Sequence, residues 1–123
     1  MKFFFADTTD NSYPEINITP GSLIADDETY EVRDCQLLNT LTGSWTKLNA
    51  GKSTRGHTHP GQEEVYIFFG RARMQIDDNY FYVNKNDVVM IPDGAFHRVH
   101  SIHKSDGNKT VEFICVFNGT RNH

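Results

Sequence analysis

The stretch that decides the fold reads Gly51-Lys-Ser-Thr-Arg-Gly-His57-Thr-His59-Pro-Gly-Gln-Glu63-Glu64-Val-Tyr-Ile-Phe-Phe-Gly70. His57 and His59 are two residues apart, and such residues face the same side of an extended strand. Both imidazoles can therefore point at one place, and the Pro-Gly pair behind them ends the strand. Glu63 and Glu64 then open an apolar strand that can return beside the histidines. Two imidazoles and a carboxylate are common ligands of a divalent transition metal.

A second segment, Pro92-Asp-Gly-Ala-Phe-His97-Arg-Val-His100, supplies a further histidine after a Pro/Gly turn. Strand alternation puts His97 and Val99 on one face and Arg98 and His100 on the other. His97 and His100 therefore cannot both point inward from a regular strand. The two histidine segments form a single site only if the fold brings them together.

The rest of the chain carries short β-rich runs separated by turn residues. No long stretch has apolar residues at helical spacing, and no internal repeat is present. Many short strands without intervening helices indicate an antiparallel sandwich or barrel. The strands expected from this pattern cover residues 2–5, 29–33, 44–48, 64–69, 71–76, 80–83, 87–91, 96–100 and 110–117.

The length of 123 residues fits a single domain, 1–123. Residues 1–28 make an N-terminal segment that is polar over 6–28 and is expected to be irregular there. Phe3-Phe-Phe5 is an apolar β segment that a partner surface would protect. A strand exchanged within a homodimer is the hypothesis for that segment.

Composition excludes several classes of partner and setting. The formal charge is -4 and no block of basic residues occurs, which argues against nucleic acid. No apolar run approaches the roughly 20 residues that span a bilayer, so no membrane association is expected. The start of the chain is not expected to act as a signal peptide, because acidic residues follow its short apolar run at once. Cys35 and Cys115 are far apart and form no CxxC pair, which predicts a reducing, cytoplasmic setting.

Together the two histidine segments resemble the two motifs of the cupin superfamily. The first motif is Gly, five residues, His-x-His, three or four residues, Glu, six residues, Gly. The second is Gly, five residues, Pro-x-Gly, two residues, His, three residues, Asn. In the second motif Asn stands in place of the first Gly and Ser in place of the last Asn. The matching positions are Gly51, His57, His59, Glu63 and Gly70, followed by Asn86, Pro92, Gly94, His97 and Ser101.

The resemblance implies an all-β, double-stranded β-helix (jelly-roll) barrel whose core covers residues 44–117. It also implies one divalent metal ion (iron, manganese, nickel, zinc or copper) held by His57, His59, His97 and a glutamate. Glu63 fits the six-residue distance to Gly70 and is preferred. Glu64 is the alternative, because it fits the four-residue spacing and begins the Glu-Val-Tyr run typical of many cupins. Adjacent strand residues face opposite sides, so only one of the two can bind the metal.

Three functions from different classes remain open, because cupins share a metal cradle and differ in chemistry. The preferred one is an isomerase or epimerase of a small, polar, carbohydrate-like substrate, since the His-Thr-His-Pro and Glu-Glu-Val-Tyr runs resemble sugar-modifying members. Glu64, Tyr66 or His100 would be its catalytic base. The alternatives are an Fe(II)-dependent dioxygenase and a non-catalytic barrel that binds a small ligand.

Four arginines are candidates for gripping an anionic substrate. In Arg71-Ala-Arg73-Met the arginines alternate with apolar residues, so ordinary solvent-facing positions are favoured for Arg71 and Arg73. Arg55 and Arg98 lie within the two histidine segments, and both remain candidates for binding an anionic substrate.

Overall fold

The computed structural model describes residues 3–4, 15–16, 21–58 and 60–121, and these residues contain strands and no helix. All strand pairs are antiparallel, so the expected all-β fold is confirmed. The strands are β1 (Phe3–Phe4), β2 (Glu15–Ile16), β3 (Ser22–Asp26), β4 (Tyr30–Leu38), β5 (Leu41–Leu48), β6 (Glu64–Phe68), β7 (Ala72–Ile76), β8 (Asn79–Val83), β9 (Val88–Ile91), β10 (His97–His100) and β11 (Val111–Asn118).

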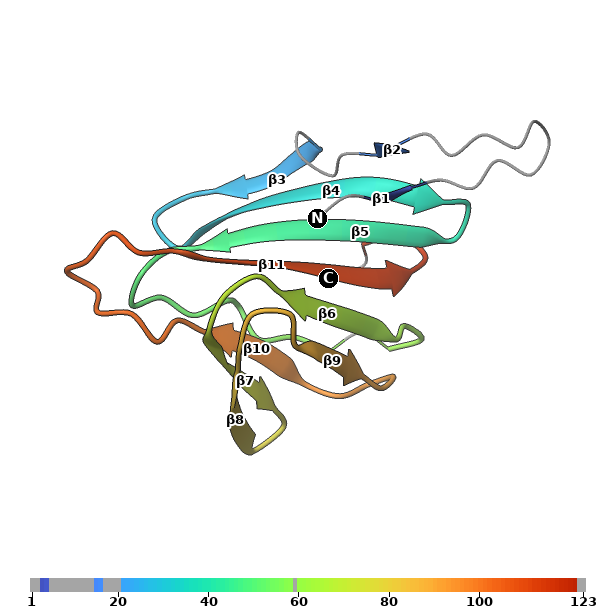
Figure 1. The fold of residues 1–123 in the computed structure, drawn as a ribbon. Coiled ribbons are helices and arrows are strands. Elements are labelled where there is room, and N and C mark those ends of the chain that lie inside the picture. The colour runs from blue at the N-terminus through green and yellow to red at the C-terminus, as the bar shows by residue number, and fades with distance from the viewer. Residues whose placement is uncertain (1–2, 5–14, 17–20, 59, 122–123) are drawn as a thin grey trace.

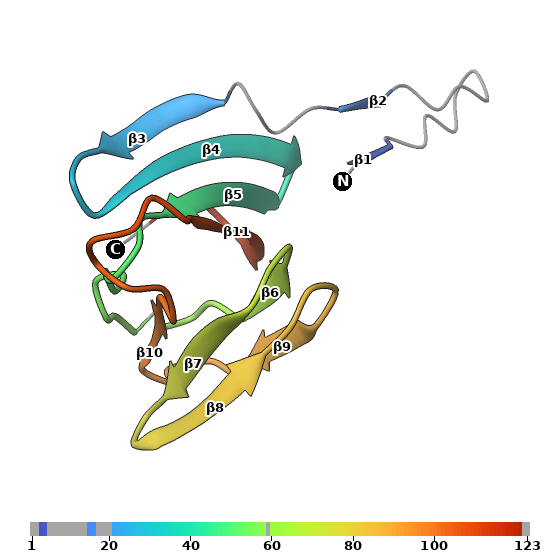
Figure 2. The same cartoon turned by 60° about the vertical axis from the view of Figure 1, so that its left-hand side comes forward.

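Two main sheets build the barrel (Figure 1). A six-stranded sheet has the order β3-β4-β5-β11-β6-β9, and a three-stranded sheet has the order β10-β7-β8. Figure 2 shows that the large sheet curves, so that β6 and β9 lie with β7, β8 and β10 on one side and face β3, β4 and β5 on the other. This two-layered antiparallel arrangement is the jelly-roll expected from the sequence.

Strand alternation decides which side chains enter the barrel. In β6 the side chains of Glu64, Tyr66 and Phe68 are buried, whereas those of Val65 and Ile67 are half-buried. The core contains large apolar side chains from both sheets, each contributing about 1.5–3 kcal/mol of transfer free energy when buried. Its fully buried members include Leu48, Phe68, Met74, Val99 and Phe113.

The turn before β9 explains one departure from the cupin pattern. Asn86, which stands where the second motif has glycine, has a φ of 74°. This left-handed conformation is natural for glycine, and asparagine tolerates it better than most other residues. The replacement therefore preserves the backbone of the turn.

The structure differs from the sequence expectation at Ser22–Asp26, which was expected to be irregular and instead forms β3 against β4. This strand lies at the edge of its sheet, and four of its five side chains are exposed. A register shift between Leu23 and Ala25 also interrupts the alternation. An exposed, bulged edge strand carries little hydrophobic periodicity, which is why the sequence pattern missed it.

Only part of the N-terminal segment lies within the described residues. Phe3 pairs with Ile16 and Phe4 with Glu15 of the same chain, forming the sheet β1-β2. The remainder of residues 1–20 lies outside the described part, as does most of the expected irregular stretch. The proposed strand exchange in a homodimer stays a prediction.

Candidate metal centre

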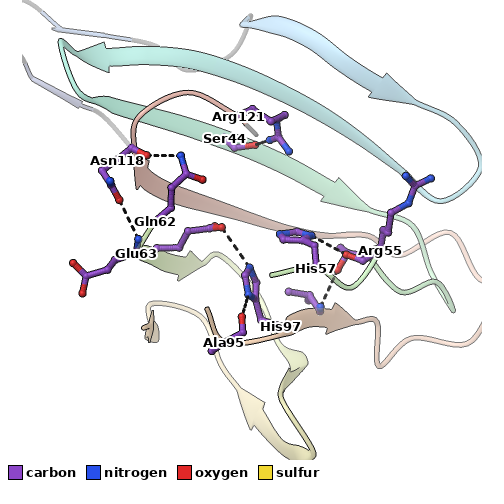
Figure 3. A network of polar contacts seen from close by, with 12 residues as sticks. Ser44, Arg55, His57, Gln62, Glu63, Ala95, His97, Asn118 and Arg121 are labelled. Atoms are coloured by element: carbon purple, nitrogen blue, oxygen red, sulfur yellow. Dashed lines mark hydrogen bonds and ion pairs between the residues drawn. The ribbon is translucent and has the colours of Figure 1, made fainter. Parts of the chain in front are cut away.

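Three side chains from separate parts of the chain converge inside the barrel. Figure 3 shows two of them, His57 and His97. His57, Glu64 and His97 each place one ligand atom within 4.8 Å of the others. Glu64 and His97 are only 3% and 1% exposed, and His57 is half-buried. Because a buried carboxylate needs compensation, a cluster of this kind indicates either an ion pair or a metal site.

Backbone pairing brings the two histidines together. The His57 N–H donates to the His97 carbonyl at 3.3 Å, and the His97 N–H donates to the His57 carbonyl at 3.1 Å. Residues paired in this way in antiparallel strands project their side chains to the same face. The ring centroids of His57 and His97 are consequently 4.5 Å apart. Gly56 lets the segment before His57 pack against Phe96, because a Cβ at position 56 would overlap the Phe96 ring.

Each histidine is oriented through its Nδ1 atom. This atom lies 3.1 Å from the Arg55 carbonyl oxygen in His57 and 2.9 Å from the Ala95 carbonyl oxygen in His97. A carbonyl only accepts, so Nδ1 carries the proton in both rings. In the neutral tautomer Nε2 then presents a lone pair to the centre, as a metal-binding histidine does.

The donor set fits a divalent metal ion. His97 Nε2 and Glu64 Oε1 are 3.4 Å apart. Two ligand atoms that each lie about 2.1 Å from one tetrahedral ion are separated by about that much. Imidazole nitrogen together with carboxylate oxygen suits iron, manganese, nickel, copper or zinc. The group could therefore hold one such ion, and the structure does not distinguish between these metals.

The structure brings Glu64, and not the preferred Glu63, into this group. β6 begins at Glu64, whose side chain is buried opposite Phe117, whereas the Glu63 side chain is exposed. The Glu63 N–H donates to Asn118 Oδ1 at 3.0 Å, which fixes the backbone just before the strand. The six-residue spacing to Gly70 therefore does not identify the glutamate that faces inward, because the pairing of β6 with β11 determines this.

Of the two other expected site residues, one lies outside the described residues and the other faces away from the group. His59 lies outside the described residues, so its role as a ligand stays a prediction. His100 points to the outer face of β10, where its Nδ1 lies 2.6 Å from Ser53 Oγ and its Nε2 lies 2.8 Å from Gln75 Oε1. The sequence-based suggestion that His100 acts as a base at the metal therefore conflicts with the alternation of the strand.

A pocket of about 340 Å³ is lined by two members of the group, His57 and Glu64. Tyr66 lines this pocket, and its ring centroid lies 5.6 Å from that of His97. Burial raises the pKa of the Tyr66 phenol well above its ordinary value, and the nearby Cys115 and Glu64 groups raise it further. The positive charge of Arg121 lowers this pKa, but by less. Tyr66 is thus a neutral hydrogen-bonding group at the site and not an anion.

Cys115 and Arg121 are polar residues of the pocket wall that the sequence pattern did not identify. Cys115 pairs directly with Tyr66, and burial, followed by the charge of Glu64, raises the pKa of its thiol well above the usual value. Beyond it, Arg121 binds Asp34 through Nε at 2.6 Å and Nη2 at 2.7 Å, and Nη2 also donates to Ser44 at 2.8 Å. Alternation along β11 could have placed Cys115 inside, whereas no local signal joins Arg121 to Asp34.

Residues 44–117 match the family model described as Cupin domain. The chain belongs to the cupin family. The match has the same bounds as the barrel core expected from the sequence motifs. Among the described residues of this cupin, no helix has the length and apolar character needed to cross a membrane.

One curated protein resembles this cupin in sequence. Uncharacterized protein MJ1618 of Methanocaldococcus jannaschii is 35% identical over 66 residues, which is 53% of this chain and 50% of that protein. The cupin therefore aligns with about half of the length of this relative.

Solved structures share the fold at low sequence identity. The Cnp3 cupin domain of Schizosaccharomyces pombe has a TM-score of 0.69 and 10% identity, covering 98% of this chain and 87% of that one. KdgF from Halomonas sp. has a TM-score of 0.68 and 12% identity, covering 98% and 94%. A mutant of Bacillus subtilis oxalate decarboxylase OxdC has a TM-score of 0.71 and 20% identity, covering 89% of this chain and 30% of that one. At these identities the likeness concerns the fold alone.

Proposed function

We propose that this cupin holds one divalent transition-metal ion through His57, Glu64 and His97, with His59 as a further ligand, and acts as an isomerase or epimerase. The substrate would be a small polar compound with a hydroxyl group beside a carbonyl group. The observation that carries the proposal is the convergence of two imidazoles and one carboxylate beside a pocket that His57 and Glu64 line. A bound ion would supply Lewis-acid chemistry by polarising the substrate carbonyl.

The chain's own residues would handle the proton. A carboxylate has two oxygens, so Glu64 can offer one as a ligand and the other as a base towards a substrate C–H group. The neutral Tyr66 phenol beside it can donate a hydrogen bond to a substrate oxygen. Both side chains are buried in the barrel, and the low polarity of such surroundings strengthens these interactions.

Proton exchange tests the proposal. The metal-loaded protein, kept without oxygen in D2O, would be incubated with small hydroxy-aldehydes, hydroxy-ketones and their acids, and substrate C–H signals would be followed by NMR. We expect loss of the signal next to the carbonyl, and we expect Glu64→Gln to abolish it. The matched control Glu63→Gln should exchange normally, because Glu63 is exposed outside the pocket. No exchange with any compound by the metal-loaded wild type would contradict the proposal.

A second candidate is an Fe(II)-dependent dioxygenase. Two histidines and one carboxylate, as in His57, His97 and Glu64, form the ligand set of many non-haem iron oxygenases. Oxygen uptake by the Fe(II)-loaded protein, dependent on an added organic substrate, would favour this function. If neither oxygen uptake nor exchange occurs and a small ligand still raises the Tm, the protein is a binding barrel.

A further inference from the structure

Six arginines occur in the chain, and their surroundings divide them into two kinds. Arg73 of β7 lies over the ring of Tyr80 at 4.5 Å, and Arg71, just before β7, lies over the ring of Tyr82 at 5.2 Å. Three other arginines bind oxygen atoms of the protein. Arg33 binds Glu31, Arg98 binds the Thr54 carbonyl and Arg121 binds Asp34. Five of the six arginines are thus engaged by the protein itself.

Arg55 is the exception. Its carbonyl oxygen orients His57, but its guanidinium makes no hydrogen bond, ion pair or ring contact within the part of the chain that the structure describes. It is exposed and lines the same pocket as His57 and Glu64. Figure 3 shows its side chain extending from the His57 segment, away from the ligand group.

The charges of the pocket explain why this position matters. The positive charge of Arg121 is offset by Asp34, and a bound divalent ion would offset Glu64. The Asp27 carboxylate also lines the pocket and is occupied by the N–H groups of Thr29 and Tyr30. Arg55 is therefore the cation of the pocket wall that no described carboxylate binds.

We infer that Arg55 recognises a carboxylate on the substrate, so that the proposed isomerase or epimerase acts on small hydroxy-acids or oxo-acids. This inference rests on the proposed function for the reacting end of the substrate. A guanidinium offers paired N–H donors that match a carboxylate, and such charge-assisted bonds are roughly twice as strong as neutral ones. The volume of about 340 Å³ lies at the lower end of the range of ligand pockets, roughly 300–1,000 Å³, and therefore fits a small molecule.

The positions of Arg55 and of the proposed metal ligands predict how the acid would be oriented in the pocket. Its carboxylate would lie at the pocket mouth against Arg55, and its hydroxyl or carbonyl carbon would reach the group of His57, Glu64 and His97. A second negative group in the pocket would approach the Asp27 carboxylate, whose charge no ion offsets and which repels it. We therefore expect monoanions to bind more tightly than dianions.

Calorimetric binding to the metal-loaded protein tests this inference without turnover. The probes are glycerate, its uncharged amide glyceramide, and inorganic phosphate, each titrated into wild type, Arg55→Gln, Arg55→Lys and Arg71→Gln. Arg71→Gln is the matched control, because it removes the same charge from a position outside the pocket. We expect wild type and Arg71→Gln to prefer glycerate over glyceramide by about tenfold or more, consistent with a hydrogen-bonded charge. Arg55→Gln should lose this preference, and Arg55→Lys should keep part of it.

Three results would overturn the inference: no binding of glycerate by wild type, an unchanged preference in Arg55→Gln, or an Arg55-dependent preference for phosphate over glycerate. The metal content of each variant, measured in the same preparations, shows that the His57 segment is intact. The outcome is separable from that of the exchange experiment. Arg55-dependent glycerate binding without any proton exchange would contradict the proposed reaction and support the carboxylate site at Arg55. Proton exchange that is unaffected by Arg55→Gln would support the reaction and contradict the carboxylate site.

Discussion

The inner and outer faces of the barrel use the same residue types in different ways. Inside, His97 lies beside Glu64 and Tyr66, with its Nδ1 on a backbone carbonyl. Outside, His100 on the same strand lies beside Tyr80 and contacts the neutral side chains of Ser53 and Gln75. The two histidines are three residues apart, yet only one has a carboxylate partner and a buried position. Residue type therefore does not identify the site, whereas the face of the strand does.

The largest difference between the faces is expected in metal binding. His97→Ala removes a proposed ligand, and even changes to residues that only support a ligand often cost about 10–100-fold in metal affinity. We expect His97→Ala to weaken binding by more than about 100-fold and His100→Ala to leave it within a few-fold of wild type. Competition with a chromogenic chelator measures both constants. Similar losses in both variants would show that the outer histidine contributes to the metal site.

The next difference concerns packing, and two methionines probe it. Met74 of β7 is fully buried, whereas Met90 of β9 is 75% exposed. Met74→Ala is expected to lower the free energy of unfolding by about 2–5 kcal/mol, because it leaves a cavity in the core. Met90→Ala should change it by no more than about 0.5 kcal/mol. Urea denaturation of the two variants measures both values, and a loss at Met90 equal to that at Met74 would show that another surface covers β9.

The smallest expected effect is the pH dependence caused by His100. Burial lowers its pKa from the ordinary value of 6.5, and the charges of Arg98 and Arg73 lower it further. The unfolded chain therefore takes up a proton at this residue more readily than the folded protein does. The resulting loss of stability begins as the pH falls through about 6.5 and is complete below the lowered folded pKa.

His100→Gln tests this pH dependence because glutamine does not titrate. Between about pH 8 and about pH 5, the free energy of unfolding should fall less in His100→Gln than in wild type. Denaturant titrations at several pH values measure the difference. Parallel pH profiles for the two proteins would mean that folding does not change the proton affinity of His100.

The parts of the fold that could be predicted are those that local pattern determines. Alternation in β10 separated His97 from His100, and motif spacing joined two distant segments into one expected site. The choice between Glu63 and Glu64 could not be made in this way. It depends on the register between β6 and β11, where a shift of one residue turns every side chain to the other face.

Long-range contacts explain the remaining omissions. Arg121 and Asp34 are 87 positions apart, and their ion pair in the pocket wall has no local signature. The distinction between Arg55 and Arg71 is of the same kind. Both arginines are exposed, and only the fold shows that Arg55 lines the pocket while Arg71 lies over a tyrosine on the outer face.

The central claim is that Glu64 and the two inward histidines hold a metal ion. Elemental analysis of wild type, Glu64→Gln and Glu63→Gln, each reloaded in turn with Fe(II), Mn(II), Ni(II), Cu(II) and Zn(II), tests it most directly. We predict about one ion per chain in wild type and Glu63→Gln, and less than about a tenth of that in Glu64→Gln. Metal retained in Glu64→Gln and lost in Glu63→Gln, or absent from the reloaded wild type, would contradict the account.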